Sequence, residues 1–338
     1  MIRNIFIVLI AFAGTALAQT STGNSAPGSL TPATASPIVN QLPISPAPLI
    51  QKSVLTPLAD NEMSVSDSIP VSGRVLKNAI AVIIGNKDYK YAPSVDYALN
   101  DASLMKKYVI DALGYRPGNI IYLEDATQGE LIRVFGSETD YKGQLYDYVR
   151  KGLSQVFIYY CGHGAPDPET KEGYLVPVDC DPSSVVLNGY SLKTLYSNLD
   201  KIDQAKQLKH ITVVLDACFS GAAVNGTLLA NVSPIYITVD KDVMASPNTT
   251  IITSSTGDQV SGWYDAKKHS LFTYFFLKGI QTDVLAGRLD TVTAKEIFNY
   301  VDDDVDGVPY WSRRLNGRTQ TPTFYGSDWV IYEGVAGR

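Results

Sequence analysis

Residues 79–85, AIAVIIG, form the stretch on which the fold assignment rests. The run is continuously apolar, rich in β-branched residues, and ends in glycine. This pattern is typical of a strand that is buried on both faces of a parallel sheet. Because the next parallel strand can be reached only by a crossover connection, we expect a helix to follow.

Residues 97–114 supply that helix. Apolar residues at positions 98, 102, 105, 109 and 112 have helical spacing, and Gly-Tyr-Arg-Pro ends the segment. The alternation then repeats, with strands predicted at residues 119–123, 155–161, 211–217 and 250–254 and helices at residues 144–152, 270–280 and 293–301. This order predicts an α/β fold in which a mainly parallel, twisted sheet carries helices on both faces.

The first 18 residues have the pattern of a cleaved signal peptide. A short positive start precedes an apolar run at residues 5–13, and Ala16 and Ala18 provide the small residues that a signal peptidase reads. The apolar run is well short of the ~20 residues that a membrane-spanning helix needs. We therefore expect a secreted or periplasmic protein that begins at Gln19 and has no membrane anchor after signal cleavage.

Residues 19–75 are rich in Pro, Ser, Thr, Ala and Gly, with only scattered aliphatic residues. No periodic apolar face is present whose burial would offset the entropy of ordering. The segment is interpreted as a flexible linker or pro-region. Residues 76–338 then remain as one large α/β domain.

Composition excludes several classes of function. The 338 residues are 45% hydrophobic and 18% charged, and 28 Lys and Arg against 34 Asp and Glu give a net charge of −6. Because nucleic-acid binding depends on a basic surface, nucleic acid is not an expected partner. Three cysteines and three histidines are too few for a disulfide scaffold or a large metal centre. We expect no required cofactor and no resident metal.

One of the three histidines and one of the three cysteines follow predicted strands. Residues 155–161 lead into CGHG at 161–164, and residues 211–217 lead into DACFSG at 216–221. Ligands bind beyond the carboxyl ends of the strands in such sheets. His163 and Cys218 there are the types of residue that serve as base and nucleophile in a cysteine hydrolase. The adjacent glycines allow backbone N–H groups to approach a substrate.

The other two histidines are weaker candidates. His210 precedes its strand by one residue, which puts it roughly 25 Å from Cys218 at ~3.3 Å per residue. His269 follows two lysines in an apparent loop before a helix, and we interpret it as a solvated loop histidine. His163 is therefore the expected base.

Structural alternatives exist for these residues. Taken singly, Cys218 could be a core cysteine and His163 a histidine that ties a loop, but their joint position favours catalysis. Cys161, His163, Cys180 and Cys218 are also zinc-ligand types, although no CxxC spacing organises them. Cys161 and Cys180 could form a disulfide in an oxidising compartment, which the sequence leaves open.

The ordered motifs resemble those of caspase-like cysteine peptidases, and those of bacterial caspase homologues and metacaspases more than those of animal caspases. The motifs are AIAVIIG, ALNDA (98–102), VFIYYCGHG, GYLVPVD (173–179), VVLDACFSG, IITSSTGDQ (251–259) and HSLFTYFFLKGI. The resemblance implies a caspase-hemoglobinase three-layer sandwich and a dyad of Cys218 and His163. It also implies an oxyanion hole formed by the backbone N–H groups of Gly164 and Cys218, and hydrolysis through a thioester acyl-enzyme, with no third catalytic residue required.

The resemblance also implies a specificity. Asp216 precedes Cys218 by two residues, so both side chains point to one face of an extended strand end. A buried aspartate needs a cation, either from the protein or from a substrate. In metacaspases and paracaspases the residues matching Asp216 and Asp101 line a pocket for Arg or Lys. Asp258 lies where a further acidic contact is expected. We predict protein or peptide substrates that are cleaved after Arg or Lys.

Each aspartate also has a structural alternative. Asp101 could cap its helix, and Asp216 could pair with a nearby lysine. Animal caspases select Asp with arginines at these places, and no arginine stands near the ALNDA, DACFSG or SSTGDQ motifs.

Calcium is expected only as an optional activator, by resemblance to calcium-activated metacaspases. DDDVDG at 302–307 imitates the opening of an EF-hand loop, but Arg313 stands where a bidentate Glu belongs, so a solvated helix end is favoured. Asp179 and Asp181 are interpreted as caps of loops.

Self-processing is expected near Arg74 or Lys77, where the linker meets the domain, and Lys267 and Lys268 form a second candidate.

Three functions compete. The first is a secreted cysteine endopeptidase with basic specificity. The alternative is a caspase-like pseudoenzyme or peptide-binding module that does not turn over, and the third is an adhesion protein whose Pro/Ser/Thr segment is a stalk. A low-pKa thiol at Cys218 would distinguish the first from the others.

Overall fold

A computed structural model describes residues 64–217, 222–223, 226–227, 246–257, 259–285 and 291–334. All of them belong to one compact unit, Leu58–Arg338. The predicted signal peptide, most of the predicted linker, Cys218 and Asp258 lie outside the described residues.

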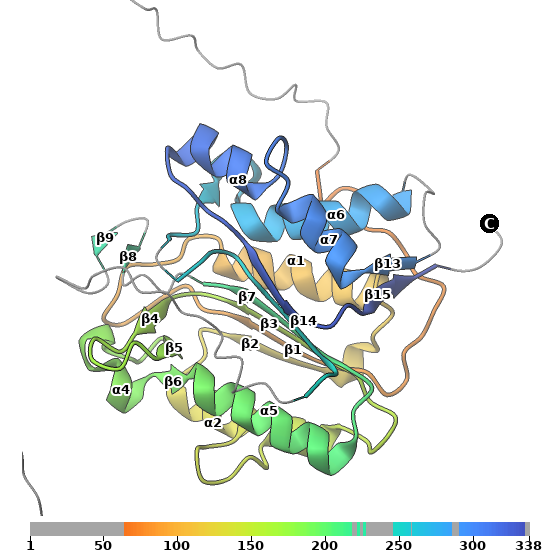
Figure 1. Ribbon diagram of the computed structural model, residues 1–338, viewed down its shortest axis with the longest axis horizontal. Helices are drawn as coiled ribbons and strands as arrows, with labels where there is room; N and C mark the ends of the chain where they lie inside the picture. The colour runs from red at the N-terminus through yellow and green to blue at the C-terminus, as the bar shows by residue number, and fades with distance from the viewer. Residues whose placement is uncertain are drawn as a thin grey trace, which may run out of the picture. The chain divides into compact units, whose positions relative to one another are not determined.

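The centre of the fold is a six-stranded sheet (Figure 1). Its strands are β1 (Ile80–Gly85), β2 (Ile120–Glu124), β3 (Val156–Cys161), β7 (Ile211–Asp216), β10 (Thr249–Thr253) and β14 (Thr323–Gly326), in the spatial order β14-β10-β7-β3-β1-β2. All neighbours pair in parallel except β10 and β14. The five predicted strands are confirmed, and every residue of β1, β3 and β7 is buried, as continuous apolar runs require.

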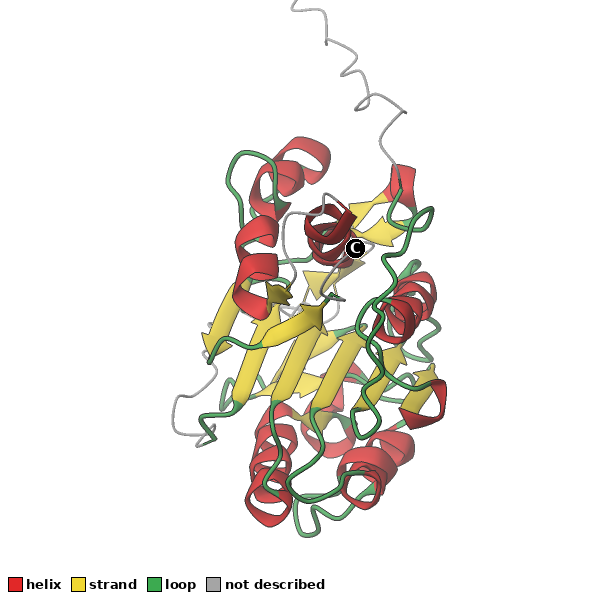
Figure 2. Cartoon of the chain, turned by 90° about the vertical axis from the view of Figure 1, so that its right-hand side faces the viewer, coloured by secondary structure: helices red, strands yellow, loops and turns green. Residues whose placement is uncertain are grey.

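Helices cover both faces of the sheet (Figure 2). One layer contains α1 (Ala98–Asp111), α6 (Leu271–Leu285), α7 (Ala294–Val301) and α8 (Val308–Trp311), and the other contains α2 (Gln128–Phe135), α3 (Gln144–Tyr148) and α5 (Leu192–Lys206). Within β1, Ala81 and Ile83 pack with the first layer, whereas Val82 and Ile84 pack with the second. The predicted three-layer α/β sandwich is confirmed.

The helices α2 and α5 of the second layer were not predicted, although the sequence contains signals for both. Thr127 and Glu130 form a complete capping box at the start of α2. Ser191 caps α5, which buries residues at positions 192, 195, 196, 199 and 202, a helical spacing.

Several short elements complete the domain. They are the sheet of β4 (Gly164–Pro166), β5 (Gly173–Leu175) and β6 (Tyr190–Ser191); the pairs β8 (Ala222–Ala223) with β9 (Gly226–Thr227), β11 (Trp263–Tyr264) with β12 (His269–Ser270), and β13 (Thr291–Thr293) with β15 (Val330–Glu333); and the helix α4 (Val185–Asn188). The described residues also form three short 3-10 helices, η1 (Pro117–Asn119), η2 (Pro182–Ser184) and η3 (Asp265–Lys267), and one π-helix, η4 (Ser312–Asn316).

Residues 64–75, which precede the predicted start of the domain, also pack against it. Val65 is fully buried, and its carbonyl oxygen accepts a hydrogen bond from the Tyr108 hydroxyl at 2.8 Å. The Gln281 side chain donates to the carbonyl oxygens of Ser64 and Ser68 at 3.1 and 3.0 Å. Residues 64–75, which their composition placed in the linker, are therefore attached to α1 and α6.

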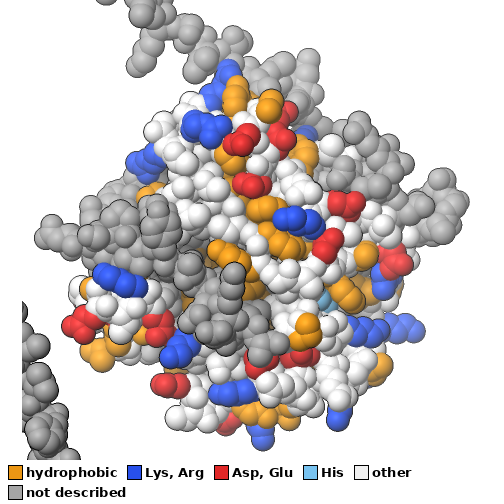
Figure 3. All heavy atoms as spheres, in the orientation of Figure 1, with side chains coloured by type: hydrophobic (Ala, Val, Ile, Leu, Met, Phe, Trp, Pro, Cys, Tyr) orange, Lys and Arg blue, Asp and Glu red, His pale blue; other side chains and the backbone are white. Residues whose placement is uncertain are grey.

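The surface carries charges of both signs. On the face shown in Figure 3, lysine and arginine side chains are interspersed with aspartate and glutamate over the described residues. None of the described helices is long and apolar enough to cross a membrane.

Gly85 allows α1 to approach β1 closely, because glycine has no Cβ atom. A Cβ atom at this position would lie 2.7 Å from both the Ala102 Cβ and the Ala98 carbonyl oxygen. We expect Gly85→Ala to lower the free energy of unfolding by about 2 kcal/mol because of overpacking, measurable by urea denaturation. Gly118→Ala is the control, since nothing lies within 4 Å of its added Cβ. Equal stability of the two variants would contradict this account.

Candidate active site

The strands that precede His163 and Cys218 are neighbours in the sheet. β3 pairs with β7 in parallel, and the register aligns Cys161 with Asp216. The Gly162 N–H donates to the Asp216 carbonyl oxygen at 3.2 Å. His163 and Cys218 each follow this aligned pair by two residues in the sequence. The predicted adjacency of the two strand ends is therefore confirmed, although Cys218 itself is not among the described residues.

His163 is held in a defined orientation. Its side-chain Nε2 lies 2.7 Å from the Pro93 carbonyl oxygen, and its backbone N–H donates to the Tyr89 hydroxyl at 2.7 Å. The Tyr89 ring packs against the imidazole, with ring centroids 4.6 Å apart. Because a carbonyl only accepts hydrogen bonds, Nε2 carries the hydrogen of the neutral ring and Nδ1 is the basic nitrogen.

Burial also sets the protonation state of His163. The residue is 6% exposed, and desolvation lowers its pKa below the usual value, while the Pro93 carbonyl opposes the shift. The imidazole is therefore neutral at pH 7 and able to accept a proton at Nδ1.

Buried polar groups fix the loop that carries His163. The Tyr160 hydroxyl lies 2.8 Å from the His163 carbonyl oxygen and 3.0 Å from that of Val176. Asn86, which follows β1 directly and is fully buried, accepts from the Ala126 N–H at 2.8 Å and donates to Val176 at 3.3 Å. Asn86, Tyr89 and Pro93 were not predicted as site residues. A polar residue directly after an apolar strand is the signal that identifies Asn86.

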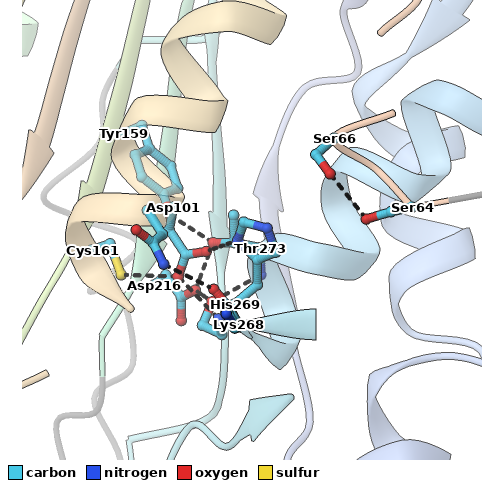
Figure 4. A network of polar contacts seen from close by, with 11 residues as sticks. Ser64, Ser66, Asp101, Tyr159, Cys161, Asp216, Lys268, His269 and Thr273 are labelled. Atoms are coloured by element: carbon cyan, nitrogen blue, oxygen red, sulfur yellow. Dashed lines mark hydrogen bonds and ion pairs between the residues drawn. The ribbon is translucent and has the colours of Figure 1, made fainter. Parts of the chain in front are cut away.

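Asp101 and Asp216 come together behind this edge of the sheet (Figure 4). Asp101 is fully buried in the first turn of α1, and Asp216, the last residue of β7, is 4% exposed. One ligand atom from each carboxylate and the Cys161 sulfur lie within 4.8 Å of one another. The two aspartates therefore lie close together although they are 115 residues apart in the sequence, and their role in substrate binding stays a prediction.

Each carboxylate has its own hydrogen-bond partners. Asp101 Oδ1 lies 2.6 Å from His269 Nδ1, and Asp101 Oδ2 accepts from the Ser270 backbone N–H at 3.0 Å. Asp216 Oδ2 accepts from the Thr273 hydroxyl at 2.7 Å and also from the Ser270 hydroxyl. Ser270 thus contacts both aspartates.

The environment raises the pKa of both carboxyl groups. Burial raises the pKa of Asp216 to about 6, and the nearby Asp101 contributes in the same direction. Burial also raises the pKa of Asp101, against the opposing effect of His269. A buried pair of anions with raised pKa values is stabilised by a cation.

Three interpretations of the sequence are wrong. Asp101 does not cap its helix, because the N-cap of α1 is Tyr97 and has no side-chain cap hydrogen bond. His269 is not a solvated loop residue: it is 7% exposed and lies on β12, which pairs with β11 and is fastened to α1 through Asp101. Asp216 is hydrogen-bonded to hydroxyl groups rather than to the lysine that was considered as its partner.

The described cysteines are separate free thiols. Cys161 Sγ lies 3.8 Å from Asp101 Oδ2, whereas Cys180 Sγ lies 3.0 Å from Asn188 Oδ1 in another buried cluster. Burial raises the pKa of Cys180 to about 12. The Cys161–Cys180 disulfide is therefore not formed. Within the described ranges, the group of possible metal ligands around Cys161 contains Asp101 and Asp216, and it does not contain His163 or Cys180.

The remaining acidic residues act locally. Asp179 accepts from the Gln128 N–H at the start of α2 at 3.0 Å, and Asp181 accepts from the Ser183 N–H at 3.0 Å. In the 302–307 segment, Asp303 accepts from two backbone N–H groups of the following turn. The interpretation of these residues as loop caps and a helix end is confirmed, while calcium activation stays a prediction.

His210 lies at the amino end of β7, whereas the candidate site lies at the carboxyl ends of the strands. Its ring stacks on Trp329 with centroids 4.6 Å apart, and its Nε2 lies 2.8 Å from the Thr250 hydroxyl. Burial lowers the pKa of His210 to about 4. These contacts indicate that His210 stabilises the packing of Trp329 and Thr250.

The lowered pKa of His210 predicts that the free energy of unfolding decreases at acid pH. The unfolded chain binds a proton at His210 near pH 6.5, whereas the folded chain does so only near pH 4, so stability falls as the pH decreases between these values. Between pH 7 and pH 5 we expect His210 to account for about 2 kcal/mol of lost stability. Urea denaturation of wild type and His210→Gln at both pH values tests this. An equal loss in both proteins would contradict it.

Known proteins are similar to this chain in sequence and in structure. The family model described as Peptidase C14, caspase domain, matches residues 78–329, about three quarters of the chain. No curated protein matches in a direct sequence comparison. Among solved structures the chain is similar to caspase-1 from Spodoptera frugiperda, with a TM-score of 0.49 and 13% identity over 80% of this chain and 96% of that chain. Through the family match over its whole sheet and both strand ends, the chain belongs to the caspase domain family of cysteine peptidases.

Proposed function

We propose that the protein is a secreted cysteine endopeptidase that cleaves peptide bonds after Arg or Lys. The observation that carries the proposal is the pair of buried carboxylates, Asp101 and Asp216, at the sheet edge that also bears His163. Membership of the family supports the general class, a cysteine peptidase acting on protein substrates.

The proposed chemistry uses a dyad. Cys218 transfers its proton to Nδ1 of His163 and attacks the scissile carbonyl carbon, while the N–H groups of Gly164 and Cys218 stabilise the oxyanion. The imidazolium then protonates the departing amine, which leaves a thioester. Water activated by the same imidazole releases the carboxylic acid and regenerates the thiol. The hydrogen bond from Nε2 to Pro93 supports this assignment because it leaves Nδ1 free for both proton transfers.

The proposed specificity follows from charge. A guanidinium or ammonium group that enters beside Asp101 and Asp216 would neutralise carboxylates that are otherwise buried close together. An acidic substrate side chain would meet like charges in a poorly solvated site, which is unfavourable. Asp258 is proposed as a third acidic contact.

The proposed location and activation rest on the sequence. Residues 1–18 would direct export, and the enzyme would process itself near Arg74 or Lys77. Both residues are exposed; Arg74 forms an ion pair with Glu333, and the backbone N–H of Leu76 donates to Gly114 at 2.8 Å. Cleavage at Arg74 therefore requires this short segment to detach first.

Fluorogenic peptides ending in Arg, Lys and Asp test the proposal. Protein lacking residues 1–18 would be assayed with calcium present and with calcium chelated, and Cys218→Ala is the blank. We expect turnover of the Arg and Lys peptides that disappears in the blank. Preference for Asp would refute the specificity, and silence after brief trypsin activation would support a binding module without turnover.

A further inference from the structure

We propose that His269 is the internal counter-ion of the acidic pair and a positioning residue for substrate recognition. In this role it holds Asp101 as an ionised acceptor and leaves the pocket one negative charge, which one Arg or Lys side chain neutralises. The inference rests on the proposed function, because it assigns a role within the same pocket.

The contact between His269 and Asp101 is direct and is fixed at both ends. Nδ1 of His269 lies 2.6 Å from Oδ1, and the next residue, Ser270, donates its backbone N–H to Oδ2 at 3.0 Å. Two successive residues of β12 therefore hold both oxygens of one carboxylate. This arrangement sets the plane of the carboxylate as well as its charge.

The same strand extends the contact to the second carboxylate. The Ser270 hydroxyl donates to Asp216, and Thr273 donates to the same oxygen at 2.7 Å. Ser270 also begins α6, since its hydroxyl accepts from the Thr273 N–H at 3.2 Å. The positions of the two carboxylates are thus coupled through one short segment, residues 269–273.

Among the labelled residues of this network (Figure 4), His269 is the buried side chain that can carry a positive charge, whereas Lys268 is exposed. Asp101 of α1 faces its Nδ1, with Cys161 of β3 and Asp216 of β7 behind that carboxylate. Tyr264 of β11 pairs with it across the hairpin, and the Tyr274 ring of α6 lies 6.5 Å away.

Of the nearby charged residues of its own hairpin, Asp265 and Lys268 are exposed and Lys267 is partly exposed. Asp265 accepts a hydrogen bond from the Tyr97 hydroxyl of α1, and the Lys268 carbonyl oxygen accepts one from Asn100. These charges are solvated, so the buried charge balance depends on Asp101, Asp216 and His269.

Charge balance explains why a counter-ion matters. With His269 protonated, Asp101 and His269 form a neutral pair, and ionised Asp216 is the one remaining charge. Without the imidazolium, either two anions stay buried without compensation or Asp101 binds a proton. A protonated carboxyl group carries an O–H donor, and a guanidinium group has only donors, so the two groups would face each other with donors on both sides. Loss of His269 should therefore weaken binding of a cationic side chain most at acid pH.

His269→Gln tests this, because glutamine retains a hydrogen-bond donor but has no charge. We expect the KM for an Arg peptide, relative to wild type, to rise about tenfold at pH 6 and by less at pH 8, because ionisation of the Asp101 carboxyl group increases with pH, with kcat changed less than twofold. Comparing variant with wild type at each pH cancels the titration of the dyad. His210→Gln is the matched control, since it removes another buried histidine from the opposite sheet edge. A KM ratio near one at both pH values, or a kcat loss that is equal at all pH values, would overturn the assignment.

A second measurement does not depend on turnover. The chain has only three histidines, so their imidazole NMR signals can be assigned with single variants in Cys218→Ala protein. We expect acetyl-arginine amide to shift the His269 signals, to leave His210 unchanged, and to have no effect on His269 in an Asp101→Asn variant. A shift in this protein, combined with no turnover of the Arg peptide by wild type, would refute the proposed function but keep the counter-ion. Binding of the arginine ligand with an unmoved His269 signal would overturn the counter-ion.

Discussion

His163→Ala is expected to lower kcat/KM for an Arg peptide about 1000-fold, because the variant has no group to accept the Cys218 proton or to protonate the leaving amine. No other described histidine can take its place, because His210 contacts Thr250 and Trp329 at the other ends of the strands and His269 is bonded to Asp101. Initial rates with the Arg peptide measure the effect. The unfolding midpoint, measured in parallel, separates lost chemistry from lost folding.

His210→Ala is the control for removal of a buried histidine, and its kcat/KM should stay within twofold of wild type. The pH profile gives a second check. Because burial lowers the pKa of His163, the base form persists below pH 6.5, and the acid limb of kcat/KM that is due to this residue should lie below that value. Activity of His163→Ala within tenfold of wild type would exclude His163 as the base.

Asp216→Asn is expected to reduce kcat/KM for an Arg peptide by about 30-fold or more, while turnover of the matching citrulline peptide changes less than threefold. The substitution removes the charge of a carboxylate that is 4% exposed, and lost pairing with a buried cation typically costs about 2–5 kcal/mol. The amide oxygen of asparagine can still accept from Ser270 and Thr273, so the local fold is retained. The ratio of Arg to citrulline turnover is the quantity to measure.

The same residue predicts a pH dependence for wild type. The pKa of Asp216 is raised to about 6, so the carboxyl group gains a proton and loses its charge as the pH falls through that value. The preference for Arg over citrulline should decrease below pH 6. Asp265→Asn, which removes an exposed carboxylate near the β11–β12 hairpin, controls for general charge and should leave the preference unchanged. An unaltered preference in Asp216→Asn would refute the pocket assignment.

The sequence by itself determined the architecture and the edge that carries the site. Strands such as residues 79–85 and 155–161 are continuous apolar runs, and this local pattern requires burial on both faces of a sheet. Alternation with helices then makes the strands parallel, so their carboxyl ends meet at one edge. His163 was predictable as a candidate for this reason, because it follows a strand directly and its position depends on local connectivity.

Only the tertiary structure decided which polar groups meet at that edge. Asp101 and His269 are 168 residues apart, and His269 stands beside two lysines in a segment whose composition is that of an exposed loop. The backbone carbonyl that orients His163 belongs to Pro93, which no side-chain pattern could identify. The physical reason is that pairing of buried polar groups is set by the packing of distant elements, here α1, β7 and β12, and each group is stable in the interior only when the others are in place.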